Sequence, residues 1–323
     1  MNILTGRAFT LLGIGITFSL LSLHGGDKLA AQESMTAVGP GRGFPALAPW
    51  VSFYGSDAQM GDLGKAAGRF RILNIDADPD AGNFTPEEIT RLKYRGRNRV
   101  ISYLNVGSME SFRTYWEQAP AGFVPGEDNT AAHLGPYDGY PDETWMDLSN
   151  SAYQHLIVDY VAPRLVAQGV DGFFLDNMEL VEHGPNDANG PCSSACRQGG
   201  LNLVARLRKK YPKLLIVMQN ATGPVTRQGI TGGVHFPTLL DGISHEEVYT
   251  PYSRDVVLEL KAWQALRLTP GGRPFWVATE DYVGSCSNLT AAHAVYNASR
   301  AQHFSPYATD ASAGQMSVCY WPF

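Results

Sequence analysis

The sequence predicts an α/β protein, a single-domain (β/α)8 barrel of the TIM type. Three observations support this prediction: eight short strand-like runs follow residue 49, helical segments separate most of them, and polar residues recur where the runs end. Alternating strands and helices indicate a parallel sheet with helices outside it. Eight repeats in about 275 residues favour a closed barrel over an open doubly wound sheet. No G-x-G-x-x-G motif follows the first run, which removes the main argument for a dinucleotide fold.

The expected strands are short apolar runs that end in glycine or in polar residues. In chain order they are residues 50–54, 70–75, 99–104, 173–175, 214–218, 240–244, 275–278 and 315–320. The fourth run follows Gly169, which is a suitable stop for the helix that precedes it.

The expected helices are one that opens at Thr85 and four further segments, 149–168, 198–211, 254–268 and 290–303. Thr85 is a good N-cap, with Pro86 at the first helical position and Glu88 three residues after the cap. Pro163 predicts a kink or a fresh start in its helix. Irregular inserts follow the third and fourth strands, and long inserts in a compact domain are usually functional.

Composition describes a globular chain and limits its partners. The 323 residues are 44% hydrophobic and 17% charged, which suffices for a large core. The net charge of −6 argues against a nucleic-acid partner and is compatible with a cationic substrate.

Residues 1–31 resemble a secretory signal peptide. Arg7 provides a positive start, residues 9–23 form an uncharged apolar run, and Ala31 offers a cleavage point. An uncleaved anchor is the alternative, although the run is short for a membrane span. We therefore expect a linker at 32–45, a barrel domain at 46–323, and export to the periplasm or the medium. We expect no membrane partner for the mature protein.

Four cysteines follow the predicted signal: Cys192, Cys196, Cys286 and Cys319. An even number in an exported chain suggests two disulfides. Of three possible pairings, Cys192 with Cys196 and Cys286 with Cys319 is the most economical. A zinc site is the alternative, but the spacing does not resemble a paired zinc knuckle.

Polar residues end seven of the strand-like runs. A lone Asp at a strand end is more often a turn former than a catalytic group. In a barrel, however, all seven positions converge on one face, where active sites form. The residues are Tyr54, Asp76, Asn105, Asp176, Asn220, Glu246 and Glu280.

Several other chemistries lack their motifs. There is no G-x-S-x-G elbow and no Walker loop, and His245-Glu246-Glu247 is not H-E-x-x-H. We therefore expect neither a metal nor a cofactor. Carboxylates beside abundant aromatic residues remain, and glycoside hydrolysis needs that combination. Core packing is the alternative role for the aromatic residues: Trp50, Tyr54, Tyr103, Trp116, Trp145, Tyr249 and Tyr282.

Three segments resemble the endo-α-1,4-polygalactosaminidase family, glycoside hydrolase family 114. Residues 103–113, Y-L-N-V-G-S-M-E-S-F-R, are similar to the family's tyrosine strand with G-S-x-E-x-x-R. Residues 172–179, G-F-F-L-D-N-M-E, are similar to its D-N-x-D strand end, with Glu179 in the last place. Residues 241–246, D-G-I-S-H-E, are similar to its strand that ends in a catalytic Glu. The resemblance runs from about residue 50 to the C-terminus and implies a (β/α)8 barrel.

Carried over by position, the resemblance implies that Asp176 is the general acid/base and Glu246 the nucleophile of a retaining mechanism. Glu247 adjoins Glu246 and is the alternative nucleophile, because strand alternation points only one of them inward. Glu110 and Arg113 have a structural ion pair as their alternative role. The expected substrate-binding residues are Tyr54, Asp76, Tyr103, Asn105, Glu110, Arg113, Asn177, Asn220, Glu247, Tyr249 and Glu280.

The function implied by the resemblance is secreted, endo-acting cleavage of an α-1,4-linked galactosamine polysaccharide that is partly deacetylated and therefore cationic. Two other functions stay open at this point. One is a non-catalytic barrel that binds a surface or biofilm polysaccharide, and the other is a glycosidase of the same fold acting on another sugar.

Overall fold

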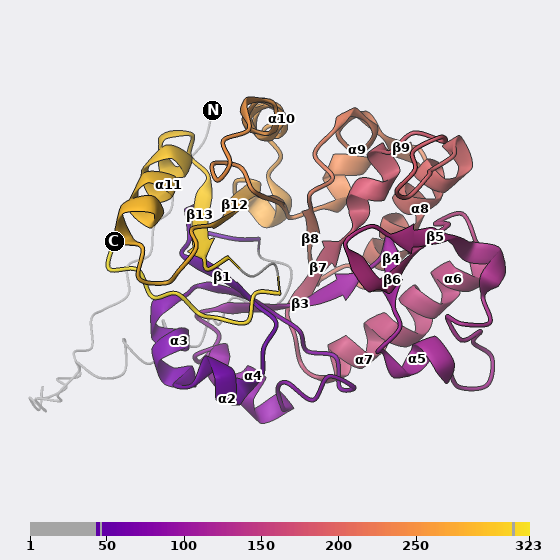
Figure 1. Ribbon diagram of the computed structural model, residues 1–323, viewed down its shortest axis with the longest axis horizontal. Helices are drawn as coiled ribbons and strands as arrows, with labels where there is room; N and C mark the ends of the chain where they lie inside the picture. The colour runs from indigo at the N-terminus through magenta and orange to yellow at the C-terminus, as the bar shows by residue number, and fades with distance from the viewer. Residues whose placement is uncertain (1–42, 46, 312–313) are drawn as a thin grey trace, which may run out of the picture. The chain divides into compact units, whose positions relative to one another are not determined.

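Eight parallel strands form one sheet that is nearly closed into a barrel, as predicted (Figure 1). The computed structural model describes residues 43–45, 47–311 and 314–323. The predicted signal peptide and most of the predicted linker lie outside the described residues. The sheet order is β1 (Trp50–Phe53), β2 (Ile72–Ile75), β3 (Arg99–Asn105), β7 (Gly172–Asp176), β8 (Leu215–Gln219), β11 (Gly242–Glu246), β12 (Trp276–Tyr282) and β13 (Ser305–Thr309).

The ends of the sheet, β1 and β13, meet without a described strand ladder between them. The indole N–H of Trp50 bridges them by donating to the backbone oxygen of Ser305 at 2.9 Å. Figure 1 shows β13 beside β1, so the two edge strands of the sheet lie next to each other.

Helices lie between the strands, and one of them begins with the cap that the sequence predicts. They are α2 (Asp57–Met60), α3 (Leu63–Arg69), α4 (Pro86–Leu92), α6 (Ser151–His155), α7 (Ala162–Ala167), α8 (Ser194–Lys210), α9 (Pro224–Gln228), α10 (Arg254–Ala265) and α11 (Leu289–Ala301). Thr85 and Glu88 form the expected capping box of α4. A π-helical segment, Leu156–Val161, separates α6 from α7 just before Pro163, where a kink or fresh start was predicted.

The last strand differs from its prediction. Residues 315–320 are not a strand, and the eighth strand is β13, ten residues earlier. Its sequence Ser-Pro-Tyr-Ala-Thr contains Pro306, which lowers strand propensity and is tolerated mainly at a sheet edge. Because β13 is an edge strand of the sheet, Pro306 is tolerated there, although its low strand propensity kept the sequence from predicting this strand.

The first insert also differs, because it is partly regular. After β3 the chain forms an antiparallel sheet of β4 (Ser108–Glu110), β5 (His133–Tyr137) and β6 (Tyr140–Met146), with α5 (Thr114–Glu117) between β4 and β5. The second insert follows β7 and contains Cys192 and Cys196. A smaller hairpin, β9 (Ile230–Thr231) with β10 (Val234–His235), lies after α9.

The inside of the barrel changes from aromatic to polar along its axis. Near the amino ends of the strands, the Trp50 ring packs on Trp276 and Phe174, with centroids 5.4 and 6.3 Å away. Strand residues two positions apart face the same side, so Ser52 and Tyr54 follow Trp50 on the inner face of β1. Aromatic side chains therefore fill the barrel at the amino ends of its strands, and polar side chains lie at the carboxyl ends.

Two Asp-Gly pairs tie strands to their neighbours. The Asp171 carboxylate accepts the N–H of Val100 at 3.0 Å, and the Asp241 carboxylate accepts that of Ile216 at 2.9 Å. Asp171 also pairs with Lys93, and Asp241 with Arg208. Both pairs lie at a strand start, five residues before Asp176 and Glu246 respectively. The glycine that follows each Asp lets the adjacent strand approach closely.

The disulfides join Cys192 to Cys196 and Cys286 to Cys319, the pairing that the sequence favoured. The second bond closes a 33-residue separation and ties the C-terminal segment to the loop after β12. None of the helices in the described part of the chain has the length and apolar character needed to cross a membrane.

We expect Gly172→Ala to lower the free energy of unfolding by about 3 kcal/mol or more. A Cβ at this position would lie 2.2 Å from the backbone oxygen of Leu215, so β7 and β8 would have to separate. Thermal or denaturant unfolding measures the effect. Gly68→Ala is the matched control, because Gly68 is an exposed residue of α3 with open space around it. It should be neutral or stabilise by up to about 1 kcal/mol, and equal losses in both variants would contradict the prediction.

Candidate active site

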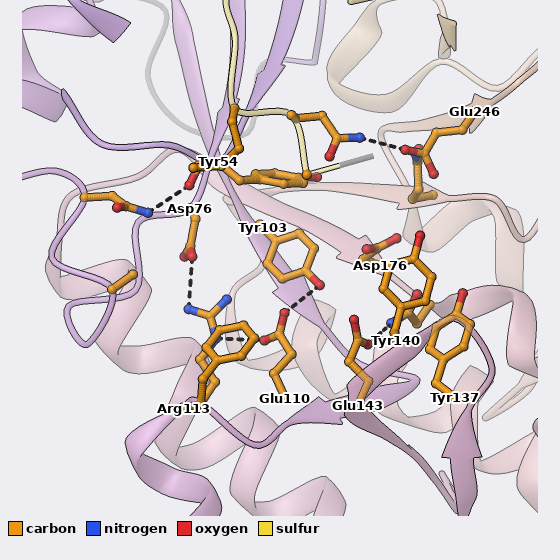
Figure 2. A pocket seen from close by; sticks show the side chains of 18 of the residues that line it. Tyr54, Asp76, Tyr103, Glu110, Arg113, Tyr137, Tyr140, Glu143, Asp176 and Glu246 are labelled. Carbon is orange, nitrogen blue, oxygen red and sulfur yellow. Dashed lines mark hydrogen bonds and ion pairs between the residues drawn. The ribbon is translucent and has the colours of Figure 1, made fainter. Parts of the chain in front are cut away.

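A cavity of about 410 Å³ lies at the carboxyl ends of the barrel strands (Figure 2). The barrel supplies most of its walls, and the first insert and the C-terminal segment supply the rest. The lining residues are Tyr54, Asp76, Ala81, Asn83, Tyr103, Glu110, Phe112, Arg113, Tyr137, Tyr140, Glu143, Asp176, Asn177, Gln219, Asn220, Glu246, Gly314, Gln315 and Met316. Five of them are acids and only Arg113 is a cation, so the cavity is strongly acidic.

Asp176 ends β7 and points into the cavity (Figure 2). Burial raises the pKa of its carboxyl well above the ordinary value, and the acids Glu179 and Glu246 raise it further. Glu179, one helical turn on, has its own pKa raised to about 7, first by burial and then by Glu246. One of its oxygens is buried without a described hydrogen-bond partner. Burial and these acids therefore favour the protonated form of Asp176.

Glu246 ends β11 and is held by three neutral donors. Oε1 accepts from the Tyr282 hydroxyl at 2.5 Å and from the Gln315 amide at 2.8 Å. Oε2 accepts from the Asn220 amide at 3.0 Å, and the Asn220 side-chain oxygen accepts the Glu246 backbone N–H at 3.0 Å. Three hydrogen bonds of this kind fix the direction of the carboxylate. Asp176 and Glu246 therefore differ in environment although both face the same cavity.

Arg113 connects two other acids of the cavity. Its guanidinium donates to Glu110 at 2.7 Å and to Asp76 at 3.0 Å, and the Tyr103 hydroxyl donates to Glu110 at 3.0 Å (Figure 2). Burial lowers the pKa of Arg113, but Glu110 and Asp76 raise it more, so the net shift is upward. The guanidinium stays charged and offsets one of the two carboxylates. The ion pair of Glu110 with Arg113, expected as the structural alternative, is therefore present. The same two residues also line the cavity, as expected of binding residues.

Glu143, on β6, was not singled out in the sequence. Its Oε2 accepts from the amides of Asn105 and Asn177, at 3.1 and 3.0 Å, and from the Ser108 hydroxyl. The Asn177 amide also donates to Ser108 at 2.7 Å. The expected residue Asn105 therefore acts beneath the cavity, by holding Glu143, and is not part of the lining.

Aromatic rings form one wall and the rim of the cavity. Tyr137 stacks on Trp145 at 4.0 Å between centroids and contacts Tyr140 at 4.7 Å. Tyr140 is 44% exposed and Phe112 is 65% exposed, although both line the cavity. Exposed rings at the edge of a polar cleft suit contact with the apolar faces of sugars.

Three further expected residues lie outside the lining. Glu247 is exposed, and its φ of 52° turns the chain directly after Glu246. Tyr249 packs against the core, with its backbone N–H on Asp281 at 2.6 Å. Glu280 is fully buried beneath the cavity, where neither oxygen has a described hydrogen-bond partner. Burial raises its pKa well above the ordinary value, and Glu246 adds to the shift.

Several lining residues that the sequence analysis missed come from two segments. Glu143, Tyr137 and Tyr140 belong to the first insert, and Gln315 belongs to the segment that was expected to be a strand. Their only sequence signal was the enrichment of the insert in aromatic and acidic residues. Within the described residues, no group of three His, Cys, Asp or Glu is arranged to hold a metal ion.

Two uncharacterised bacterial proteins are similar to this chain in sequence. One, from Thermotoga maritima, is 27% identical over 158 residues, which are 47% of this chain and 46% of the relative. The other, from Deinococcus radiodurans, is 23% identical over 213 residues, which are 60% of this chain and 61% of the relative. The chain thus matches between about half and three fifths of the length of these relatives.

Among solved structures, the glycoside hydrolase domain of PelA from Pseudomonas aeruginosa is similar in fold. The TM-score is 0.60 at 15% identity, and the match covers 84% of this chain and 98% of that domain. A likeness at this identity supports the barrel fold alone.

The family model described as glycoside-hydrolase family GH114 matches residues 45–232, which include the first five barrel strands, the first insert and Asp176. The match spans more than half of the chain. The protein therefore belongs to glycoside-hydrolase family GH114.

Proposed function

We propose that the protein is a secreted, endo-acting glycoside hydrolase that cleaves α-1,4-linked galactosamine polysaccharide by a retaining, two-carboxylate mechanism. The observation that carries the proposal is the contrast between Asp176 and Glu246 in one cavity. Burial and neighbouring acids favour a proton on Asp176, whereas three neutral donors hold the carboxylate of Glu246. Glycoside hydrolysis needs one acid and one carboxylate.

In this mechanism Asp176 protonates the glycosidic oxygen while the Glu246 carboxylate bonds to the anomeric carbon, and the leaving sugar departs as an alcohol. The Asp176 carboxylate then takes a proton from water, whose oxygen attacks the same carbon and releases Glu246. The Asn220, Tyr282 and Gln315 side chains would hold Glu246 in line with the anomeric carbon.

The charge of the cavity supports a cationic substrate. Five acids and one arginine line it, and the whole chain has a net charge of −6. A cleft with one sign of charge attracts a ligand of the other sign. The exposed rings of Phe112 and Tyr140 would extend the contact to neighbouring sugars of a polymer. The signal-like N-terminus and the two disulfides support secretion.

We expect Asp176→Asn and Glu246→Gln each to reduce cleavage of a deacetylated galactosamine polymer by about 1,000-fold or more. Each change keeps the size of the side chain and removes the acid or the nucleophile. Release of reducing ends measures the effect, and proton NMR of the first product tests retention of the anomeric configuration. Glu247→Gln should keep most of the activity, because Glu247 does not line the cavity.

Other outcomes would contradict parts of the proposal. Wild-type protein that retains the polymer without any cleavage would indicate a non-catalytic binder. Cleavage of another polysaccharide, with none of any galactosamine polymer, would refute the substrate. In a substrate complex, the two carboxyl groups should lie about 5–5.5 Å apart for retention, and a separation above about 6.5 Å would instead indicate inversion.

We expect Glu179→Gln to shift the alkaline limb of the kcat/KM profile to lower pH. The negative charge of Glu179 raises the pKa of Asp176, so its removal lets Asp176 lose the proton at a lower pH. Activity at pH 8 should therefore fall more than activity at pH 5. Glu127→Gln, an exposed substitution outside the cavity, is the control for net charge. An alkaline limb that does not move would contradict the pairing of Asp176 with Glu179.

A further inference from the structure

Glu143 lies at a position where a second negative charge is unfavourable. It lies on β6 directly opposite Glu110 of β4, so two acids form a cross-strand pair. Like charges in direct opposition destabilise an antiparallel pair. Arg113 compensates Glu110, but none of the described ion pairs includes Glu143.

The surroundings of Glu143 fix its carboxylate without pairing it with a cation. Neutral donors from Asn105, Asn177 and Ser108 all bind one oxygen, Oε2. Among the described hydrogen bonds, Oε1 accepts none, and the side chain lines the cavity. Figure 2 shows Glu143 beside Asp176 and Tyr140, directed toward the open space.

The other acids of the cavity are engaged differently. Asp76 and Glu110 share the guanidinium of Arg113. Glu246 is held by three donors in the role proposed for the nucleophile, and Asp176 lies in surroundings that favour its neutral form. Among the lining acids, Glu143 is therefore the carboxylate that neutral donors fix, that no described ion pair includes and that has no part in the bond-breaking step.

We propose that Glu143 binds the protonated amino group of a sugar residue in the cavity and so selects deacetylated over N-acetylated positions. This inference rests on the proposed function, because it names the group that recognises the substrate. An ammonium group offers three donors and a full positive charge to Oε1. An N-acetyl group offers one neutral donor and more bulk, and leaves the carboxylate uncompensated.

The test compares Glu143→Gln with Glu127→Gln on two α-1,4-galactosamine oligomers, one fully deacetylated and one fully N-acetylated. Both variants lose one negative charge, but Glu127 is an exposed residue of the first insert outside the cavity. For Glu143→Gln we expect kcat/KM on the deacetylated oligomer to fall at least tenfold, mainly through KM. Its value on the acetylated oligomer and the values for Glu127→Gln should stay near wild type.

A second measurement separates this inference from the proposed function. Equilibrium binding of free galactosamine and galactose does not depend on cleavage. Wild type should bind galactosamine at least tenfold more tightly, and Glu143→Gln should lose most of that preference. An unchanged preference in Glu143→Gln, or no preference in wild type, would overturn the role of Glu143. If wild type shows the preference but cleaves no galactosamine polymer, the proposed function fails and the role of Glu143 stands.

Discussion

The hydrogen-bonded register of the barrel strands is the constraint on which the site depends. Asp171 and Asp241 each accept a backbone N–H from the strand beside them, and each is followed by a glycine that permits close strand contact. The acids five residues further on then reach the same end of the barrel. A shift of register by one residue would turn Asp176 or Glu246 to the outer face. The positions of the two acids therefore follow from contacts made at the opposite end of their strands.

The acids around the cavity differ because their neighbours differ. Glu110 and Asp76 share a cation, Glu246 and Glu143 have neutral donors, and Glu280 is buried without a described hydrogen-bond partner. Burial among other acids favours the protonated form of a carboxyl group, whereas neutral donors fix its direction. One acidic cavity thus offers carboxyl groups in several different environments.

Local sequence patterns predicted most of the barrel and part of the site. Apolar runs and caps located seven of the eight strands, and the strand ends pointed to Tyr54, Asp76, Asp176, Asn220 and Glu246, all of which line the cavity. Such patterns carry no information about contacts between distant segments. Glu143 and Gln315 reach the cavity only through the fold of the first insert and of the C-terminal segment. Pro306 lowers the strand propensity of β13, so the local pattern did not predict that strand. The burial of Glu280 depends on packing by other segments, which the sequence of its own strand does not show.

The Cys286–Cys319 bond has a consequence for the alignment of Glu246. Tyr282 and Gln315 both donate to Glu246, and each lies four residues from one of these cysteines. The bond thus tethers the two segments that orient one oxygen of that carboxylate. A chain that folds before these thiols are oxidised lacks the tether. Maturation of the active site is in this way coupled to the redox state of the compartment in which the chain folds.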